Sequence, residues 1–546
     1  MPRKLHADLF GAHLIVIEAT DCGDLAGYRF GHADWAEAFF TVDDGAILRP
    51  HSDKGLSRQF GRLTPPESDA PSINGPALFG VRPGHEFVYR LPVSGKRPMT
   101  ISVGRLPDGV MFDAAVGVLT GRIVEAGTSH MRVVASNAWG YAERDFALKV
   151  GSDICLTPPM GWNSWNIHNA NVTDSAIRSA ARGMVESGLA DHGWCYVNID
   201  DGWTVKLSPE AKVRRDNGKI IPNEKFPDMR SLAGYVHSLG LKIGIYSSPG
   251  AETCGGYAGS LGYERRDAAT YAEWGFDYLK YDWCSYDKVF AAETKGRANT
   301  VEDYARPYRL MSEALQAQNR DIIHAFCQYG MGDVQSWGRA AGAQVWRSHG
   351  DLKDSWGALV KSIDSYGEMA WKYAGPGFWC DPDMLVVGYL DTDKGLHWSD
   401  LTHNEQYTHM TLWCMLNAPL LLGCDLNRLD DFTKGLLTND DVLSVNQDSL
   451  GKSARRVIRR DDMDVWLRPI VGQAYVVAIV NRFPYTRDIS LDFASVGLPR
   501  KAWVKDLWRR MCLGIKEDSV TFSIPGHACM MIKVVEECPG CESRKL

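Results

Sequence analysis

The 546-residue sequence lacks the features that would assign it to a membrane or to nucleic acid. No apolar run reaches the ~18 residues that a membrane-spanning helix requires. Blocks of about five or more like charges are absent, and the net charge of −7 gives no long-range attraction for nucleic acid or an anionic membrane. We therefore expect a neutral partner, with no nucleic acid bound and no membrane insertion.

The sequence also lacks the ligand pattern of a metal site. Its thirteen cysteines are spread along the chain, and no CxxC pair lies near histidines. Cys538 and Cys541 form a CPGC motif, but a lone pair offers two ligands where a structural zinc site needs about four. We predict no metal and no cofactor.

Aromatic residues, in contrast, are abundant. The chain has 18 Trp and 21 Tyr. These side chains can simply fill hydrophobic cores, but their flat faces also stack on the C–H faces of sugars. Composition alone leaves both readings open.

Eight short apolar segments recur along residues 155–430, each ending in a polar or aromatic cluster and each followed by a stretch with helical spacing. Strands that alternate with helices indicate a parallel sheet, and eight of them fit a closed barrel. The predicted fold class is therefore α/β, with a (β/α)₈ TIM barrel, a C-terminal antiparallel β-domain and N-terminal β-sandwich-like domains. Chemistry in such a barrel lies at the carboxyl ends of the strands.

A chain of this length exceeds what one core supports, and its strand patterns divide it into four predicted blocks. Residues 1–60 form a partial β-sandwich, and residues 70–150 a second, smaller sandwich. Residues 155–440 form the barrel, and residues 441–535 the C-terminal β-domain.

The first predicted strand ends supply polar and aromatic side chains. Trp165 follows the first strand and either points into the barrel mouth or packs beneath the loop. Asp200 and Asp201 follow the second strand, where they suit recognition of sugar hydroxyls or serve as turn and cap residues. Tyr246 ends the third.

The fourth strand places Lys280 and Asp282 on the same side, because side chains alternate along a strand. A nearby cation keeps a carboxylate ionised and nucleophilic. Arg347 and Asp351 follow at the sixth strand end, and Asp383 at the seventh. With acids abundant and clustered histidines scarce, the pattern favours the carboxylate pair of a glycoside hydrolase over metal-assisted hydrolysis; structural ion pairs are the alternative.

Several motifs at these strand ends, in one order, resemble glycoside hydrolase family 27, which contains α-galactosidases and α-N-acetylgalactosaminidases. They are TPPMGWNSW at 157–165, IDDGW at 199–203, GIY at 244–246, YLKYD at 278–282, DPDML at 381–385 and VNQD at 445–448. The resemblance covers residues 155–535. It implies a (β/α)₈ barrel, a C-terminal antiparallel β-domain and exo-hydrolysis with retention of anomeric configuration.

The resemblance also assigns roles to residues. Asp282 matches the family nucleophile and Asp351 the acid/base, a pair that should lie ~5–5.5 Å apart in a retaining enzyme. The residues implied to line the sugar pocket are Trp165, Asp200, Asp201, Tyr246, Lys280, Arg347 and Asp383, with the two adjacent aspartates holding the O4 and O6 side of galactose.

The chain departs from the family in two places. It has Cys327-Gln328-Tyr329-Gly330 where many α-galactosidases have Cys-Glu-Trp, which puts the amide of Gln328 near the sugar 2-position. Gly202 replaces a frequent cysteine and removes one family disulfide, whereas Cys254 and Cys284 match another pair, whose bridging stays open. An α-galactoside oligo- or polysaccharide is the favoured substrate.

Three alternatives remain open. The first two are an α-N-acetylgalactosaminidase and a β-L-arabinopyranosidase on the same barrel. The third is a carbohydrate-binding protein that holds sugar without cleaving it. The sequence predicts no oligomeric state.

Upstream motifs resemble the immunoglobulin-like domain found beside bacterial glycosidases. They are INGP at 73–76, GVRPG at 80–84, LPDG at 106–109, TGRI at 120–123 and ASNAWG at 135–140. Residues 9–47 resemble the end of a preceding carbohydrate-binding module, and residues 1–8 lack the apolar core of a secretory signal. We expect a module truncated at its start and an extracellular or periplasmic location.

Overall fold

The structure is a computed structural model that describes residues 40–41, 47–48, 62–460 and 462–536. The chain divides into two compact units, residues 1–59 and 60–546. In the first unit, β1 (Phe40–Thr41) and β2 (Ile47–Leu48) pair in antiparallel fashion. The remainder of the sandwich predicted at residues 1–60 lies outside the described residues.

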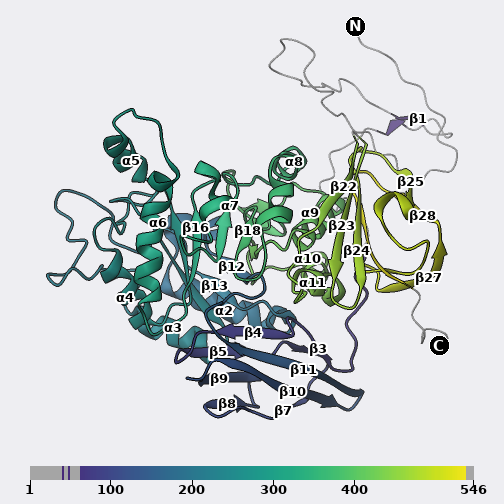
Figure 1. Ribbon diagram of the computed structural model, residues 1–546, viewed down its shortest axis with the longest axis horizontal. Helices are drawn as coiled ribbons and strands as arrows, with labels where there is room; N and C mark the ends of the chain where they lie inside the picture. The colour runs from purple at the N-terminus through teal and green to yellow at the C-terminus, as the bar shows by residue number, and fades with distance from the viewer. Residues whose placement is uncertain (1–39, 42–46, 49–61, 461, 537–546) are drawn as a thin grey trace, which may run out of the picture. The chain divides into compact units, whose positions relative to one another are not determined.

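The centre of the second unit is an eight-stranded parallel barrel (Figure 1). Its strands in chain order are β12 (Met160–Asn163), β13 (Tyr196–Asn198), β14 (Lys242–Ser247), β15 (Tyr278–Asp282), β16 (Ile323–Cys327), β17 (Val345–Arg347), β18 (Trp379–Asp381) and β21 (Leu420–Leu422). The first strand pairs with the last, and beyond β18 the amide of Leu385 donates to the carbonyl of Leu421 at 2.8 Å. This closure confirms the predicted (β/α)₈ fold class.

Helices follow the barrel strands as expected for alternating β and α segments. They are α1 (Trp165–His168), α2 (Asp174–Glu186), α3 (Met229–Ser238), α4 (Glu264–Trp274), α5 (Tyr286–Thr294), α6 (Val301–Gln316), α7 (Val334–Trp337), α8 (Trp356–Tyr373), α9 (His403–Met415), α10 (Asp431–Leu437) and α11 (Asp440–Asn446). Helix α2 shows why the pattern works. Thr173 caps it by accepting from the amide of Ala176, and Ile177, Ala181 and Met184 are buried on one face.

Most of the aromatic excess fills the core. Eight tryptophans are among the largest fully buried side chains: Trp162, Trp194, Trp203, Trp346, Trp379, Trp413, Trp466 and Trp508. The high aromatic content therefore mainly reflects packing of the core, and only a few aromatic side chains are placed to contact a sugar.

An N-terminal β-sandwich lies beside the barrel (Figure 1). One sheet has the order β4-β11-β10-β7 and a second the order β5-β9-β8, and their inner faces share one hydrophobic core. The strands are β3 (Ser72–Ile73), β4 (Leu78–Val81), β5 (Glu86–Arg90), β6 (Val93–Ser94), β7 (Thr100–Gly104), β8 (Val110–Asp113), β9 (Val118–Arg122), β10 (Gly127–Asn137) and β11 (Gly140–Val150). The ion pair between Arg82 and Asp321, at 2.5 Å, fastens this sandwich to the barrel.

The chain ends in a second β-domain. Its main sheet has the order β22-β23-β24-β29-β26-β27, with β25 and β28 as a separate pair. The strands are β22 (Arg455–Arg459), β23 (Met463–Ile470), β24 (Ala474–Asn481), β25 (Arg487–Asp492), β26 (Lys501–Asp506), β27 (Met511–Glu517), β28 (Ser519–Ile524) and β29 (Cys529–Glu536). A short pair, β19 (Tyr389–Leu390) and β20 (His397–Trp398), forms a hairpin at the barrel mouth.

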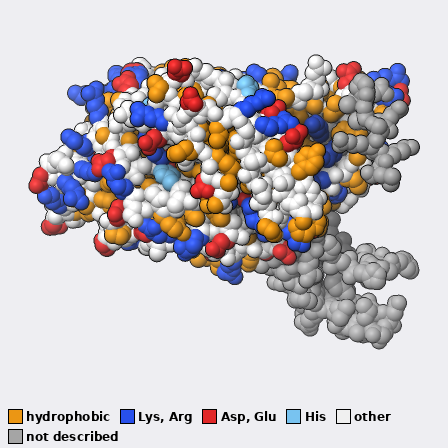
Figure 2. All heavy atoms as spheres, turned by 90° about the horizontal axis from the view of Figure 1, so that it is seen from below, with side chains coloured by type: hydrophobic (Ala, Val, Ile, Leu, Met, Phe, Trp, Pro, Cys, Tyr) orange, Lys and Arg blue, Asp and Glu red, His pale blue; other side chains and the backbone are white. Residues whose placement is uncertain are grey.

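Two surface properties bear on partners. None of the helices in the described part of the chain is long and apolar enough to cross a membrane. On the face shown in Figure 2, acidic and basic side chains are interspersed rather than gathered by sign.

Candidate active site

A pocket opens at the carboxyl ends of the barrel strands. Its empty volume of about 660 Å³, open mouth included, falls within the range usual for small-molecule sites. The sequence-predicted residues that line it are Trp165, Asp200, Asp201, Tyr246, Lys280, Asp282, Arg347, Asp351 and Asp383. The structure thus brings together nine of the ten predicted site residues.

Asp282, the last residue of β15, is buried at the base of this pocket. The hydroxyl of Tyr246 donates to its Oδ2 at 3.0 Å, and the hydroxyl of Tyr329 donates to its Oδ1. Burial raises the pKa of Asp282, while the charge of Lys280 and the two hydroxyl donors oppose that rise. The carboxylate is fixed in orientation through both of its oxygens.

Lys280 connects two neighbouring strand ends. Its ammonium nitrogen lies 2.8 Å from Oδ2 of Asp200, which also accepts from the side-chain amide of Asn163 at 2.8 Å. The sequence pattern placed Lys280 beside Asp282; the direct ion pair goes to Asp200, and Asp282 feels the cation through its charge alone.

Asp200 and Asp201 combine the two roles that the sequence left open. Both line the pocket, and both also hold backbone: Asp200 accepts from the amide of Asp201, and Asp201 accepts from the amides of Gly202 and Gly255 at 2.8 and 2.7 Å. Burial raises the pKa of Asp201 to about 6. These hydrogen bonds fix the turn, which places both carboxylates on one side of the cavity.

Gly202 has a structural reason to lack a side chain. Its φ is +102°, and a Cβ atom there would lie 2.6 Å from the carbonyl oxygen of Ala170. The cysteine that the family resemblance implies at this position would not fit the turn in this conformation.

Arg347 links the acid of one strand end to that of the next. Its guanidinium lies 3.0 Å from Asp351 and 2.8 Å from Asp383. The Asp351 side chain is 69% exposed, unlike that of Asp282. Partial desolvation favours a higher pKa for Asp351, but the Arg347 and Lys280 cations outweigh it and hold the pKa below its ordinary value.

Gln328 does not line the pocket. Its side chain is fully buried, and its amide donates to the carbonyl of Met331 at 2.7 Å. The next residue, Tyr329, lines the pocket in its place and donates to Asp282. Sequence reasoning quoted Tyr329 within the motif but assigned it no role, because the motif does not say which side chain of the loop turns inward.

The open disulfide question is answered, since Cys254 and Cys284 are bridged. The Tyr246 hydroxyl lies 3.2 Å from Sγ of Cys284, and the Tyr329 hydroxyl lies 3.7 Å from Sγ of Cys254. The bridge therefore contacts both hydroxyls that hold Asp282.

The pocket mouth includes residues that the sequence did not single out. Lys353, two residues after Asp351, pairs with Asp393 across the opening, and Thr392 lies beside Asp393. Asp354 anchors this loop from behind: it accepts from Thr392 at 2.6 Å and lies 2.8 Å from Nε2 of His397. An irregular loop gives no periodic signal by which these residues could have been found.

Three family models match successive parts of the chain. The family model described as Alpha galactosidase A matches residues 157–448, and the model described as Alpha galactosidase C-terminal beta sandwich domain matches residues 460–534. An Ig-domain model matches residues 70–151.

Individual relatives extend over most of the chain. The Alpha-galactosidase of Cyamopsis tetragonoloba is 37% identical over 381 residues, which cover 69% of this chain and 85% of the relative. That of Coffea arabica is 39% identical, covering 69% and 93%. The crystal structure of a proposed alpha-galactosidase of Bacteroides fragilis is 32% identical, with a TM-score of 0.78 and coverage of 86% and 99%.

A (β/α)₈ barrel with paired carboxylates in a strand-end pocket, together with these relatives, defines a glycoside hydrolase. The chain belongs to the alpha galactosidase A family, which confirms the predicted membership of glycoside hydrolase family 27.

Proposed function

We propose that the protein is a retaining exo-α-galactosidase that removes terminal α-D-galactosyl residues from oligo- or polysaccharides. The observation that carries this proposal is the presence in one pocket of a buried, doubly hydrogen-bonded Asp282 and a more exposed Asp351. Two acids in such different environments suit the separate roles of nucleophile and acid/base.

In the first proposed step, Asp282 attacks the anomeric carbon. The glycosidic C–O bond breaks, protonated Asp351 gives its proton to the leaving oxygen, and a galactosyl ester of Asp282 forms. Tyr246 and Tyr329 orient the attacking carboxylate through their hydrogen bonds. In the second step Asp351 takes a proton from water, the water oxygen attacks the same carbon, and the ester bond breaks. Two displacements retain the α configuration.

The charge state of Asp351 before sugar binds requires one further step. Arg347 favours the ionised form of Asp351, whereas the first displacement needs the protonated form. A bound galactoside would cover the exposed carboxyl and exclude water, which raises the pKa of an acid. Substrate binding itself would thus protonate Asp351.

Asp200 and Asp201 support the choice of galactose. Their carboxylates converge on one side of the pocket and can accept from the O4 and O6 hydroxyls. The relatives from Cyamopsis tetragonoloba and Coffea arabica, both named alpha-galactosidases, support the same substrate class. Tyr329, rather than Gln328, would face the sugar 2-position, where it competes for space with an acetamido group.

The test is a side-by-side assay of the p-nitrophenyl glycosides of α-galactose, α-N-acetylgalactosamine and β-L-arabinopyranose. We expect the highest kcat/KM with α-galactose, and NMR should detect α-galactose as the first product. A higher kcat/KM with one of the other two glycosides would identify the protein as an α-N-acetylgalactosaminidase or a β-L-arabinopyranosidase instead. If none is cleaved while galactose still binds, the carbohydrate-binding protein replaces the enzyme.

The location and domain limits are part of the proposal. A disulfide such as Cys254–Cys284 persists in oxidising compartments, which supports an extracellular or periplasmic location. We propose domain limits at residues 70–150, 155–440 and 441–535, and the family matches at 70–151, 157–448 and 460–534 support them.

A further inference from the structure

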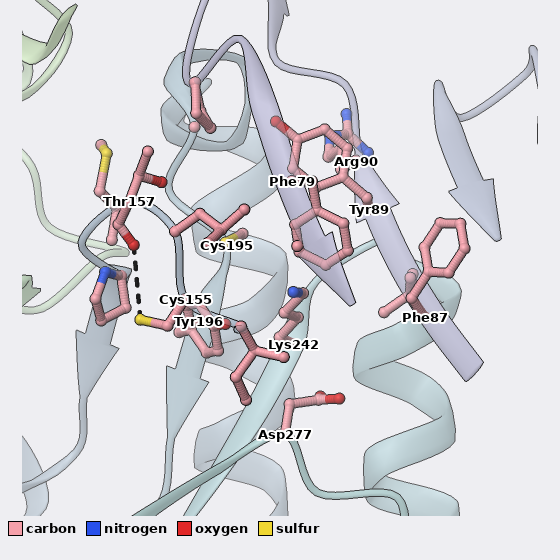
Figure 3. Close-up of a pocket in the computed structure, with 18 of the residues that line it drawn as sticks. Phe79, Phe87, Tyr89, Arg90, Cys155, Thr157, Cys195, Tyr196, Lys242 and Asp277 are labelled. Carbon is pink, nitrogen blue, oxygen red and sulfur yellow. Dashed lines mark hydrogen bonds between the residues drawn. The ribbon is translucent and has the colours of Figure 1, made fainter. Parts of the chain in front are cut away.

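A second cavity lies at the opposite end of the barrel from Asp282. Its barrel wall is formed by residues at the amino ends of strands, such as Tyr196 at the start of β13 and Lys242 at the start of β14. The facing wall belongs to β4 and β5 of the N-terminal sandwich (Figure 3). We name it the basal cavity; its empty volume is about 1010 Å³, open mouth included.

The walls of the basal cavity are largely aromatic. Phe79 lies between two rings of the sandwich, with its centroid 5.9 Å from that of Phe87 and 5.0 Å from that of Tyr89. Tyr196 forms the barrel side. Flat apolar faces on both walls suit a ring or a short chain, because apolar surface buried between them leaves water.

Two cations line the cavity: Arg90, which pairs with Asp191, and Lys242, which stands among these rings. The ammonium nitrogen of Lys242 lies 4.2 Å from the ring centroid of Phe79 and 5.4 Å from that of Tyr196, and Figure 3 shows its side chain reaching toward them. The ammonium group forms no ion pair or hydrogen bond with any other residue that the structure describes. Ring faces compensate only part of the charge of a half-buried ammonium.

The acids near Lys242 are already engaged. Asp277 accepts from Arg320, pairs with His237 at 2.8 Å and accepts from the amide of Ile243. A second carboxylate in the lining, the half-buried Asp321, is held by the sandwich residue Arg82. Burial alone would raise the pKa of Asp277, but nearby cations, Lys242 among them, lower it. Neither acid forms an ion pair with Lys242 itself.

The two thiols in the lining cannot act as counter-ions either. Burial raises the pKa of Cys155 to about 12 and that of Cys195 to about 11. Both therefore stay protonated near neutral pH. Glu86 is a third carboxylate in the lining, but it forms no ion pair with Lys242, and neither does any other acid among the described residues. Lys242 is thus a cation in an aromatic cavity without a direct anionic partner.

We propose that the basal cavity binds a small organic anion, a carboxylate or sulfonate with an apolar ring or short-chain body, whose acid group pairs with Lys242. The body lies between Phe79 and Tyr196, where the rings exclude water. Because the ligand contacts both walls, its binding fastens the sandwich to the barrel and stabilises the folded chain.

The probe is a charge series on one body: 3-phenylpropionate, 3-phenylpropan-1-ol and 3-phenylpropylamine. Each is titrated into the full chain with galactose in excess, so that the strand-end pocket stays filled, and melting temperature and calorimetry report binding. We expect saturable stabilisation by the acid and affinities at least about tenfold weaker for the alcohol and the amine.

Variants then locate the site. Lys242→Met should weaken 3-phenylpropionate binding at least about tenfold, and Lys242→Arg should keep it within about threefold. Lys96→Met is the matched control, since Lys96 lies 4.5 Å from the ring of Trp139 outside the cavity. It should bind the acid as the unaltered protein does.

Three outcomes would overturn the proposal: no saturable binding of the acid, equal binding of acid and alcohol, or unchanged binding by Lys242→Met. If Lys242→Met fails to fold, the charge series on the unaltered protein decides alone. Hydrolysis is not used as a readout, so the result is independent of the proposed galactosidase activity.

Discussion

Tyr329 and Asp282 form the most specific contact of the site: the phenol of Tyr329 donates to one carboxylate oxygen of Asp282, while Tyr246 occupies the other. The pairing ties a loop residue after β16 to the proposed nucleophile on β15. Since both hydroxyls also contact the Cys254–Cys284 bridge, the nucleophile is held by a small assembly that no single strand provides.

Replacing Tyr329 by Phe should slow hydrolysis and change its pH dependence. A hydrogen bond to a charged group contributes roughly 1.5–3 kcal/mol, so we expect kcat/KM to fall about 10- to 100-fold. The lost donor had favoured the ionised form, so the pKa of Asp282 rises further above its ordinary value. The acid limb of the kcat/KM profile should therefore move to higher pH.

The control for this variant is Tyr235→Phe. Tyr235 is a half-buried residue of α3 whose hydroxyl accepts from Arg182 at 3.4 Å, away from the pocket. It should leave the profile unchanged. If Tyr329→Phe lowers kcat/KM but leaves the acid limb where it was, Tyr329 shapes the pocket without affecting the ionisation of Asp282.

The roles of the two acids can be separated with azide. Asp282→Ala removes the proposed nucleophile, and hydrolysis should fall by at least about 10³-fold while galactose still binds. Azide can enter the vacated space and attack the anomeric carbon from the Asp282 side, so the product should be the β-galactosyl azide. With Asp351→Ala and an activated leaving group, azide should instead open the enzyme ester and give the α-galactosyl azide.

Product anomers read by NMR decide the assignment. An α-azide from Asp282→Ala would mean that another group forms the ester. Unchanged hydrolysis by Asp282→Ala would remove this residue from the mechanism altogether.

Removing the disulfide should affect both stability and catalysis. Cys254 and Cys284 are 30 residues apart, and closing a loop of that size stabilises a fold by about 3–4 kcal/mol in the chain-entropy description. The double variant Cys254→Ala/Cys284→Ala should lower the urea midpoint. It should also lower the kcat measured at temperatures well below the melting range, because both tyrosine hydroxyls lose a contact that orients them.

A control separates general loosening from this local effect. Arg82→Lys weakens an ion pair between sandwich and barrel, far from Asp282. It should lower stability with kcat maintained. If the cysteine variant likewise keeps its full kcat, the bridge is structural only.

The positions of the polar side chains at the barrel mouth could be predicted because simple geometry governs them. Asp282 and Arg347 end barrel strands, and three further acids come within four residues of a strand end: Asp200, Asp351 and Asp383. All lie at the edge where the carboxyl ends of the parallel strands meet. The motif around Gln328 was read less well. Whether Gln328 or Tyr329 faces the pocket depends on the turn of a short loop, which residue identity alone does not fix.

Contacts between distant segments were beyond the sequence for a related reason. The pairing of Lys353 with Asp393 and the anchoring of Asp354 by Thr392 join loops that carry no periodic pattern. The basal cavity arises only when the sandwich packs against the barrel. In both cases the contacts join residues that are far apart in the sequence, and local sequence patterns do not predict such contacts.

His192 predicts a specific dependence of stability on pH. Its side chain is 1% exposed and lies between Asp440, at 2.8 Å, and Glu67, at 3.3 Å. Burial alone would lower the pKa of His192, but hydrogen bonds and charges from the two acids raise it to about 9. The unfolded value is near 6.5, so the folded chain holds this proton more tightly.

The stabilisation from this proton is therefore complete below about pH 6.5 and is lost as the pH rises through about 9, at most about 3 kcal/mol in all. Urea unfolding at pH 6.5 and 9.5 should show this loss. His192→Gln should be less stable at pH 6.5 and should lack this part of the decline, while His130→Gln, at an exposed strand position, should follow the unaltered protein. A decline of equal size in His192→Gln would assign the pH dependence to other groups, because glutamine cannot release the proton on which the argument depends.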